Sequence, residues 1–224
     1  MNEYLTFDDV LIKPTYSEIT SRDNVSIKSY LTSITFGANS QLTIFQVGVA
    51  ANSCLTSIVF PDSVTTINSW AFNNCTSLTS VTLPTNVNFT TINRTTFYYC
   101  TSLTSITIPD SVETIGENAF WKCTSLISIT IPDSIETIGS LAFYQCSSLT
   151  SINIPDSVTT IGDRAFKKTG ITSIVIPDSV TSIGSDFVSK CSSLSSITVD
   201  ANNNSFSDIS GVLFNKDKST LIQY

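Results

Sequence analysis

A unit of 23 residues repeats three times in direct succession, and this period constrains the fold more than any other feature of the chain. The three copies are 100–122, 123–145 and 146–168, and each follows the pattern C-[TS]-S-L-x-S-I-x-I-P-D-S-[VI]-x-T-I-G-x-x-A-F before a short variable stretch. Looser copies occupy 54–74, 75–99 and 169–190, the second of which carries extra residues around 86–88. Imperfect copies flank these six units, so the sequence predicts stacked coils that share one core.

The residues of one unit predict where its strand lies and where it ends. In 100–122, Leu103, Ile106 and Ile108 occupy the inward positions of a short strand. Pro109 cannot donate to a strand ladder, so the strand should end there. We expect the phenylalanine near the end of each unit to stack between coils as an aromatic spine, made of Phe72, Phe97, Phe120, Phe143, Phe166 and Phe187.

One position of the unit is occupied only by glycine and asparagine. Its members are Asn68, Asn93, Gly116, Gly139, Gly162 and Gly184. Glycine and asparagine are the residues that best tolerate a positive φ. The sequence therefore predicts a left-handed backbone conformation at this position of every coil.

The period of 23 residues and the L-x-x-I-x-I strand are typical of a leucine-rich-repeat solenoid. We predict a right-handed β-solenoid with short parallel strands, built mostly of strands and turns. Residues 1–30 form a non-repeat segment that could act as a cap, 31–199 form the solenoid, and 200–224 form a terminal hairpin. Because the sequence stops inside that hairpin, we expect a truncated array with an uncapped C-terminal end that is open to self-association.

The composition excludes several classes of function. The net charge of −7 argues against nucleic acid, whose binding requires an excess of Lys and Arg. The chain has no histidine, which removes Ser-His-Asp and Cys-His catalysis and His-ligated metals. No apolar run is long enough to span a bilayer, and residues 1–4 lack the features of a signal peptide. We therefore predict a protein that is not an enzyme, with no catalytic residue, no metal ligand and no cofactor.

The cysteines and the aspartates each form a row at one repeat position. Cys54, Cys75, Cys100, Cys123 and Cys146 align, and Cys191 follows after Thr169. Side chains in register point in parallel, so we favour buried thiols, with disulfides and a metal site as alternatives. An aspartate follows proline at Asp62, Asp110, Asp133, Asp156 and Asp178. Stacked like charges repel unless they are solvated or share a cation, so a calcium edge is one interpretation; we favour aspartates that cap their own turns.

The outward positions of the strands form a flat, uncharged and hydroxyl-rich surface, which we call the strand face. Solenoids use such faces for extended binding. Threonine also suits an exposed strand that binds nothing, and a threonine ladder is similar to an ice-binding surface. We favour ligand binding and place its candidate residues at Thr79, Thr82, Thr104, Thr107, Ser128, Thr130, Thr150 and Asn153.

Aromatic and basic residues gather at variable positions near the spine phenylalanine of each unit. They are Arg94, Tyr98, Tyr99, Trp121, Lys122 and Tyr144. Tyr, Trp and Arg are favoured anchors of protein interfaces. We place a second candidate binding surface there, with Tyr98, Tyr99, Trp121 and Tyr144 as its ligand-contacting residues.

These motifs resemble the BspA-like, or Treponema-type, leucine-rich repeats, whose pattern is a Cys, an L-x-x-I-x-I-P strand, a V-x-x-I-G turn and an A-F pair. The resemblance covers about 31–199, and the stretch 210–224 is similar to a hairpin that interrupts arrays of that family. Known members are mainly surface-exposed or secreted proteins of microbes and protists that adhere to host matrix proteins or other cells. The resemblance implies an extracellular or cell-surface location and a ligand on a host matrix or another cell.

The first residues do not follow the repeat. Residues 4–14, 16–17 and 21–23 are similar to the opening segment of inosine-monophosphate dehydrogenases and guanosine-monophosphate reductases. The catalytic parts of those enzymes lie in a TIM barrel that this chain lacks. We interpret the segment as a fusion or recombination remnant that serves as an N-terminal cap, and we transfer no enzyme residue to this chain.

From the sequence we expect a binding or adhesion module that recognises a protein or glycan ligand through its repeat surface. The alternative is a self-associating structural component of a larger assembly, because an open solenoid end exposes unpaired edge groups. Neither function involves nucleic acid or a transmembrane segment.

Overall fold

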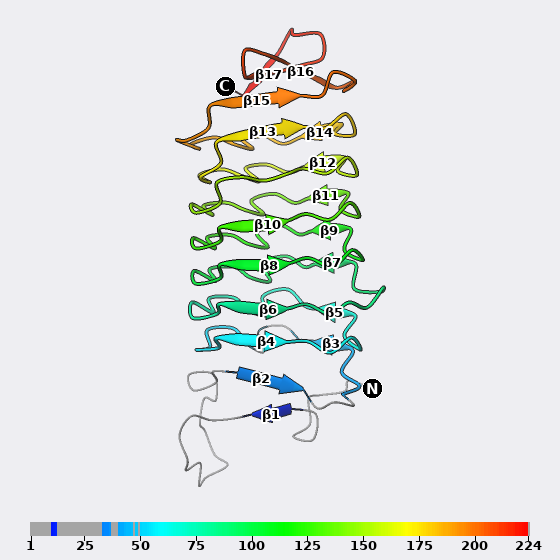
Figure 1. Ribbon diagram of the computed structural model, residues 1–224, viewed down its shortest axis with the longest axis vertical. Coiled ribbons are helices and arrows are strands. Elements are labelled where there is room, and N and C mark those ends of the chain that lie inside the picture. The colour runs from blue at the N-terminus through cyan, green and yellow to red at the C-terminus, as the bar shows by residue number, and fades with distance from the viewer. Residues whose placement is uncertain (1–9, 13–32, 37–39, 47, 49, 224) are drawn as a thin grey trace.

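The computed structural model describes residues 10–12, 33–36, 40–46, 48 and 50–223. Over these residues the chain is a parallel β-solenoid of about seven turns that lie about 23 residues apart, with no helix (Figure 1). The predicted stack of short-stranded coils is therefore confirmed.

Each coil contributes up to two short strands. The first strands are β2 (Ser33–Phe36), β4 (Ser57–Val59), β6 (Ser80–Thr82), β8 (Ser105–Thr107), β10 (Ser128–Thr130), β13 (Ser173–Ile176) and β15 (Ser196–Val199). The second strands are β3 (Ile44–Phe45), β5 (Thr66–Ile67), β7 (Thr91–Ile92), β9 (Thr114–Ile115), β11 (Thr137–Ile138), β12 (Thr160–Ile161) and β14 (Ser182–Ile183). Where neighbouring coils pair, the strands are parallel and equivalent residues lie opposite one another, as Ile106 and Ile129 do.

The core runs along the solenoid axis and is made of equivalent residues from successive coils. The spine phenylalanines are fully buried. The rings of Phe97, Phe120 and Phe143 stack with centroids 5.4 Å apart and planes within 13° of each other. Phe45 extends the stack at the N-terminal side, with its ring 5.4 Å from that of Phe72. The predicted aromatic spine is therefore present as a ring stack from Phe72 to Phe166, and Phe187 is buried at the equivalent position of the next coil.

The predicted left-handed conformation at the Gly/Asn position is wrong. Positive φ values occur elsewhere in the coil, and the glycines of this column do not have them. In the four coils that carry glycine there, the reason is the close approach of the preceding coil, whereas Asn68 and Asn93 hold the position in the two coils before them. A Cβ at Gly162 would lie 2.3 Å from the backbone nitrogen of Ser140, and one at Gly184 would lie 2.2 Å from that of Asp163.

The left-handed residues form two columns that we call the left-handed columns. The first has φ between 55° and 66° and consists of Gly48, Trp70, Thr95, Asn118, Leu141, Arg164 and Asp186. The second has φ between 57° and 65° and consists of Asn52, Asn74, Tyr99, Lys122, Gln145, Lys168 and Lys190. The conformation directs backbone N–H groups along the axis. For example, Leu141 N donates to Asp163 O at 2.8 Å, and Lys122 N donates to Tyr144 O at 2.8 Å.

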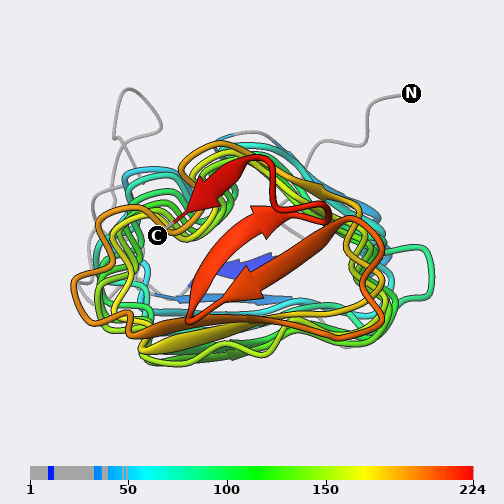
Figure 2. The ribbon, with the colours of Figure 1, turned by 90° about the horizontal axis from the view of Figure 1, so that it is seen from above.

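A three-stranded antiparallel sheet covers the C-terminal end of the solenoid (Figures 1 and 2). Its strands are β16 (Phe206–Ile209), β17 (Val212–Asn215) and β18 (Leu221–Gln223). Ser210 and Gly211, with φ of 52° and 83°, form the tight turn between β16 and β17. Phe206 and Leu213 are buried against the core of the last coils. The expectation of an uncapped C-terminal end is therefore wrong for the described residues, because this sheet covers the core.

Only a short part of the predicted N-terminal cap lies among the described residues. β1 (Val10–Ile12) pairs antiparallel with β2 and places Val10 opposite Phe36. The remainder of the enzyme-like segment lies outside the described residues, so its role as a cap stays a prediction.

Candidate functional site

Four of the eight predicted residues of the strand face lie in the first strands β6, β8 and β10, and the other four lie next to these strands or in the equivalent segment of the coil 146–168, which has no first strand. The strands read exposed, buried, exposed in β6, β8 and β10, as their alternation predicts. The parallel register places Ser105 opposite Ser128 and Thr107 opposite Thr130. The predicted residues Thr79, Thr82, Thr104, Thr107, Ser128, Thr130, Thr150 and Asn153 are all exposed. They span four successive coils and therefore offer one continuous surface.

The strand face presents hydroxyl groups and a few aliphatic side chains without any charge. No charged residue occurs in the strand segments 56–59, 79–82, 104–107, 127–130, 150–153, 172–175 and 195–198. Val59, Ile127 and Val175 stand among the hydroxyls with 60%, 58% and 55% of their surface exposed. Some hydroxyls are held by the preceding coil, as Thr79 Oγ1 donates to Thr56 O at 3.0 Å. Others are free of such backbone contacts in the described structure, so a ligand can reach them.

The second candidate surface is a stack of rings that we call the aromatic flank, made of Trp70, Tyr98, Tyr99, Trp121 and Tyr144. The rings of Tyr98 and Trp121 lie 4.3 Å apart with planes at 1°, and those of Trp121 and Tyr144 lie 5.5 Å apart at 8°. Tyr99 packs at 5.7 Å from Trp121. Sequence reasoning missed Trp70, whose ring lies 6.0 Å from that of Tyr98, because it precedes the spine phenylalanine instead of following it.

Two lysines lie over the rings of the aromatic flank. Lys122 Nζ is 4.8 Å from the ring centroid of Tyr99 and 4.6 Å from that of Trp121, and it donates to Tyr99 Oη at 3.4 Å. Lys168 Nζ lies 5.5 Å from the centroid of Tyr144. These distances are typical of cation–π contacts, which fix the position of the ammonium groups. The structure therefore brings the four predicted aromatic residues and Lys122 together, whereas Arg94 pairs with Glu117 at 3.5 Å.

Four cysteines of the coils are buried thiols rather than reactive groups. Cys75, Cys100, Cys123 and Cys146 are fully buried, and none of the six cysteines forms a disulfide. Cys123 Sγ donates to Phe97 O at 3.2 Å, and Cys100 and Cys146 make the equivalent bond at 3.2 and 3.1 Å. Burial raises the pKa of Cys100, Cys123 and Cys146 well above the ordinary thiol value. A protonated, inaccessible thiol is neither a nucleophile nor a metal ligand.

Ser53, and not Cys54, occupies the thiol position of the first full coil. Ser53 is buried, and its Oγ lies 3.5 Å from Cys75 Sγ. Cys54 is exposed. The assignment of Cys54 to the cysteine row is therefore wrong, because this coil has one residue fewer before its buried leucine. Thr169 replaces cysteine in the same way further along, with Oγ1 3.2 Å from Cys191 Sγ.

The aspartate row does not act as predicted where its contacts are seen. Asp62 Oδ1 accepts hydrogen bonds from Thr85 N at 2.9 Å and Thr85 Oγ1 at 2.8 Å, so it bonds the next coil and does not cap its own turn. These two bonds, the backbone one first, lower the pKa of Asp62. The neighbouring serines bond the preceding coil instead, as Ser134 Oγ donates to Val112 O at 2.6 Å. Over the described part of the chain, no three Cys, Asp or Glu side chains lie close enough together to hold a metal ion.

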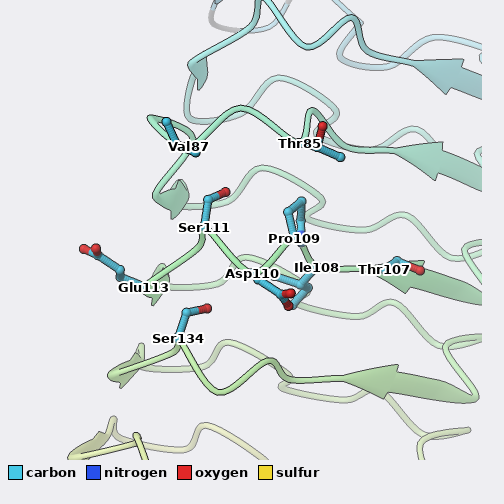
Figure 3. Close-up of a pocket in the computed structure, with 9 residues that line it drawn as sticks. All are labelled: Thr85, Val87, Thr107, Ile108, Pro109, Asp110, Ser111, Glu113 and Ser134. Carbon is cyan, nitrogen blue, oxygen red and sulfur yellow. The ribbon is translucent and has the colours of Figure 1, made fainter.

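A groove of about 610 Å³ opens next to the coil that carries the extra residues (Figure 3). The extra loop is fixed to the preceding coil, since Asn86 Nδ2 donates to Asp62 O at 2.7 Å. Its tip residue Val87 is 80% exposed. Thr107 is the one predicted site residue that lines the groove. The groove therefore adjoins the edge of the strand face without containing it.

Short parallel strands, an L-x-x-I-x-I core pattern and a shared phenylalanine spine define the chain as a leucine-rich-repeat protein. A family model, the BspA type leucine rich repeat region, matches in six copies over residues 43–128 and 90–220. The chain belongs to this family, as its motifs predicted. A search of the curated proteins finds no significant match. Over the described residues, no helix is long and apolar enough to cross a membrane.

Three solved structures illustrate the relationship. A leucine rich cell surface protein from Faecalibacterium prausnitzii is 31% identical with a TM-score of 0.73, and the match covers 99% of this chain and 61% of that one. The T. pallidum leucine-rich-repeat protein is 25% identical with a TM-score of 0.60, covering 73% of this chain and 84% of that one. A leucine-rich repeat protein from Eubacterium ventriosum, 24% identical with a TM-score of 0.57, shares the fold over 86% of this chain and 46% of its own. The chain thus spans less than two thirds of the F. prausnitzii protein.

Proposed function

We propose that the chain is a non-catalytic binding module of a cell-surface or secreted protein, which recognises a protein or glycan ligand through the strand face. The observation that carries this proposal is the continuous exposure of eight hydroxyl or amide side chains across four coils. The F. prausnitzii relative is a cell surface protein, which supports the location. Adhesion to a host matrix or to another cell is part of the proposal.

The physical character of the strand face suits a broad and shallow contact. Its backbone is fixed by inter-coil hydrogen bonds and by the spine, so ordering costs little on binding. Hydroxyl and amide groups supply donors and acceptors at the regular spacing of a sheet, and Ile127 adds an apolar contact at its centre. The absence of charge in the strand segments means that binding here should depend weakly on salt.

Surface plasmon resonance with a panel of extracellular-matrix proteins and glycans tests the proposal. The double variant Thr107→Lys/Thr130→Lys places two charges at the centre of the strand face, and we expect at least a tenfold loss of affinity for any ligand found, because each charge must be desolvated. Thr181→Lys is the matched control, since Thr181 is exposed and lies outside the strand face. Unchanged binding by the double variant, or no ligand in the panel, would count against the proposal.

Self-association is the second candidate, and the terminal sheet supplies the observation that favours it. β18 is an edge strand, and its Leu221 is 54% exposed. Unprotected edge strands pair readily with other chains. Light scattering over a concentration series separates the two functions: a growing mass that Leu221→Lys abolishes supports assembly, whereas a monomer at high concentration refutes it.

A further inference from the structure

The positive charges of the solenoid are confined to one part of each coil. Between residues 40 and 200 the Lys and Arg residues all lie after the second strand of a coil, beside the aromatic flank; they are Arg94, Lys122, Arg164, Lys167, Lys168 and Lys190. Most acidic residues of the same stretch lie instead on the turn after the first strand or just beyond it: Asp62, Asp110, Glu113, Asp133, Glu136, Asp156 and Asp178. A locally basic strip therefore exists on a protein whose net charge is −7.

Half of these cations are neutralised by neighbouring carboxylates. Arg94 lies 3.5 Å from Glu117, while Arg164 and Lys167 lie 3.6 and 2.8 Å from Asp186. Lys122, Lys168 and Lys190 make no ion pair with any described residue. These three, which we call the lysine row, are therefore the charges available to a ligand.

The lysine row follows the solenoid axis. All three lysines belong to the second left-handed column, so they occupy equivalent positions of different coils. Lys168 and Lys190 lie in adjacent coils, about 5 Å apart at the backbone, and Lys122 lies two coils before Lys168, roughly 10 Å away. The row thus matches a ligand that is linear and carries repeated negative charges.

Backbone conformation gives independent support to a function for these side chains. A left-handed φ is unfavourable for a lysine, whereas glycine or asparagine would adopt it readily. Lysine is nevertheless present at three of the seven members of the column, with φ of 58°, 61° and 61°. Residues held in unfavourable conformations are found preferentially at functional sites.

The arrangement of the rings indicates what the ligand is. Tyr98, Trp121 and Tyr144 stack on one another, so their faces are covered and mainly their edges are exposed. Neutral sugars that stack on ring faces therefore find little surface here. A protein interface normally has a desolvated apolar centre, and Lys122 covers that part of Tyr99 and Trp121. The ammonium groups of Lys122 and Lys168, which lie over these rings, suit sulfate or carboxylate groups on a slender chain.

We propose that the lysine row, flanked by Trp121 and Tyr144, binds a linear anionic glycan that runs along the solenoid axis. This inference rests on the proposed function, because it assumes an extracellular module. It adds a second surface, with its own ligand class, beside the strand face.

Binding of heparin, a sulfated linear polysaccharide, to the full chain tests the proposal by titration calorimetry at several salt concentrations. We expect affinity to fall as salt rises, because the contacts are exposed ion pairs. Lys122→Gln/Lys168→Gln/Lys190→Gln should weaken binding about tenfold or more, as three such contacts are lost. The matched single variants are Lys168→Gln, expected to weaken binding, and Lys218→Gln in the terminal turn, expected to leave it unchanged. Far-UV circular dichroism confirms that each variant is folded.

Three results would overturn the proposal. They are an unaffected triple variant, an equal loss from Lys218→Gln, and polyglutamate binding as tightly as heparin, which would make the partner an acidic protein segment. Neutral dextran should not bind. The strand-face double variant is assayed with its own ligand, so the two proposals can fail separately. If heparin binds through the lysine row and no strand-face ligand is found, only the proposed strand-face function is refuted. If a strand-face ligand is found and heparin does not bind, only this inference is refuted.

Discussion

Replacing Gly162 with alanine should destabilise the solenoid by forcing two coils apart. The added Cβ would lie 2.3 Å from Ser140 N, 2.6 Å from Gly139 C and 2.7 Å from Ser140 Cα. Favourable contact between heavy atoms begins near ~3.5 Å, so the backbones must separate by roughly 1 Å. The obstructing atoms belong to the backbone, which cannot rotate away as a side chain could.

The expected loss combines two contributions. Overpacking of a tight contact costs about 1–3 kcal/mol. The same movement lengthens the hydrogen bond from Gly162 N to Ile138 O, now 2.8 Å, and weakens it; its net contribution is about 1 kcal/mol. The free energy of unfolding should therefore fall by about 3 kcal/mol, which corresponds to a drop of roughly 6–12 °C in the melting temperature for a chain of this size.

Urea and thermal denaturation followed by far-UV circular dichroism measure this loss. Gly162→Asn separates the two explanations of the glycine column, because asparagine tolerates a positive φ but still carries a Cβ. Close approach predicts that asparagine is at least as damaging as alanine. Ser140→Ala in the preceding coil is the control, expected within about 0.5 kcal/mol of wild type, as surface substitutions usually are. A Gly162→Ala protein as stable as wild type would refute the contact argument.

Four further predictions follow from the structure. Leu141→Gly should raise the free energy of unfolding by about 0.5–1 kcal/mol. Glycine removes the steric strain of a φ of 58°, and this gain exceeds the larger conformational entropy that glycine loses on folding. A lower melting temperature would contradict this. Phe143→Ala should lose about 3–5 kcal/mol in urea unfolding, because its fully buried ring stacks on Phe120 and Phe166 at 5.4 and 5.5 Å. A thiol reagent at pH 8 should label exposed Cys54 and spare Cys123 until the chain unfolds; early labelling of Cys123 would count against its burial. Burial raises the pKa of Cys123 above the ordinary 9.0. The contribution of this thiol to stability should therefore be complete below pH 9 and decline at higher pH, because the thiol of the unfolded chain then ionises. A melting temperature that stays constant from pH 8 to 10.5 would contradict this.

The repeat predicted the parts of the fold that depend on which side of a strand a residue faces. Ser105, Ile106, Thr107 and Ile108 alternate between hydroxyl and aliphatic side chains, and burial follows that alternation directly. The Gly/Asn column was misinterpreted because residue type alone does not distinguish a positive φ from a close contact. The contact that selects glycine joins backbones about 22 residues apart, so it depends on how tightly coils stack.

In the candidate sites, too, the sequence predicts which side chains are exposed but not how successive coils stack. Exposure of the strand face followed from the pattern, whereas the parallel stack of Tyr98, Trp121 and Tyr144 depends on the rise between coils. Aligning the repeats by residue type places Cys54 in the thiol row. The structure instead matches buried positions, and Ser53 fills the thiol position in a coil that is one residue shorter.

The left-handed columns differ from the core columns in how much their residue types vary. The core columns repeat one residue type because each side chain packs against its equivalents, as Phe120 does between Phe97 and Phe143. The left-handed columns instead vary in residue type, although a single type, glycine, would satisfy their backbone best. Contacts between identical side chains therefore do not fix the residue type of these columns, and conformational preference opposes most of the residues in them. The ammonium groups of Lys122 and Lys168, in the second of these columns, lie over rings of the aromatic flank, so a ligand of this solenoid should first be sought there.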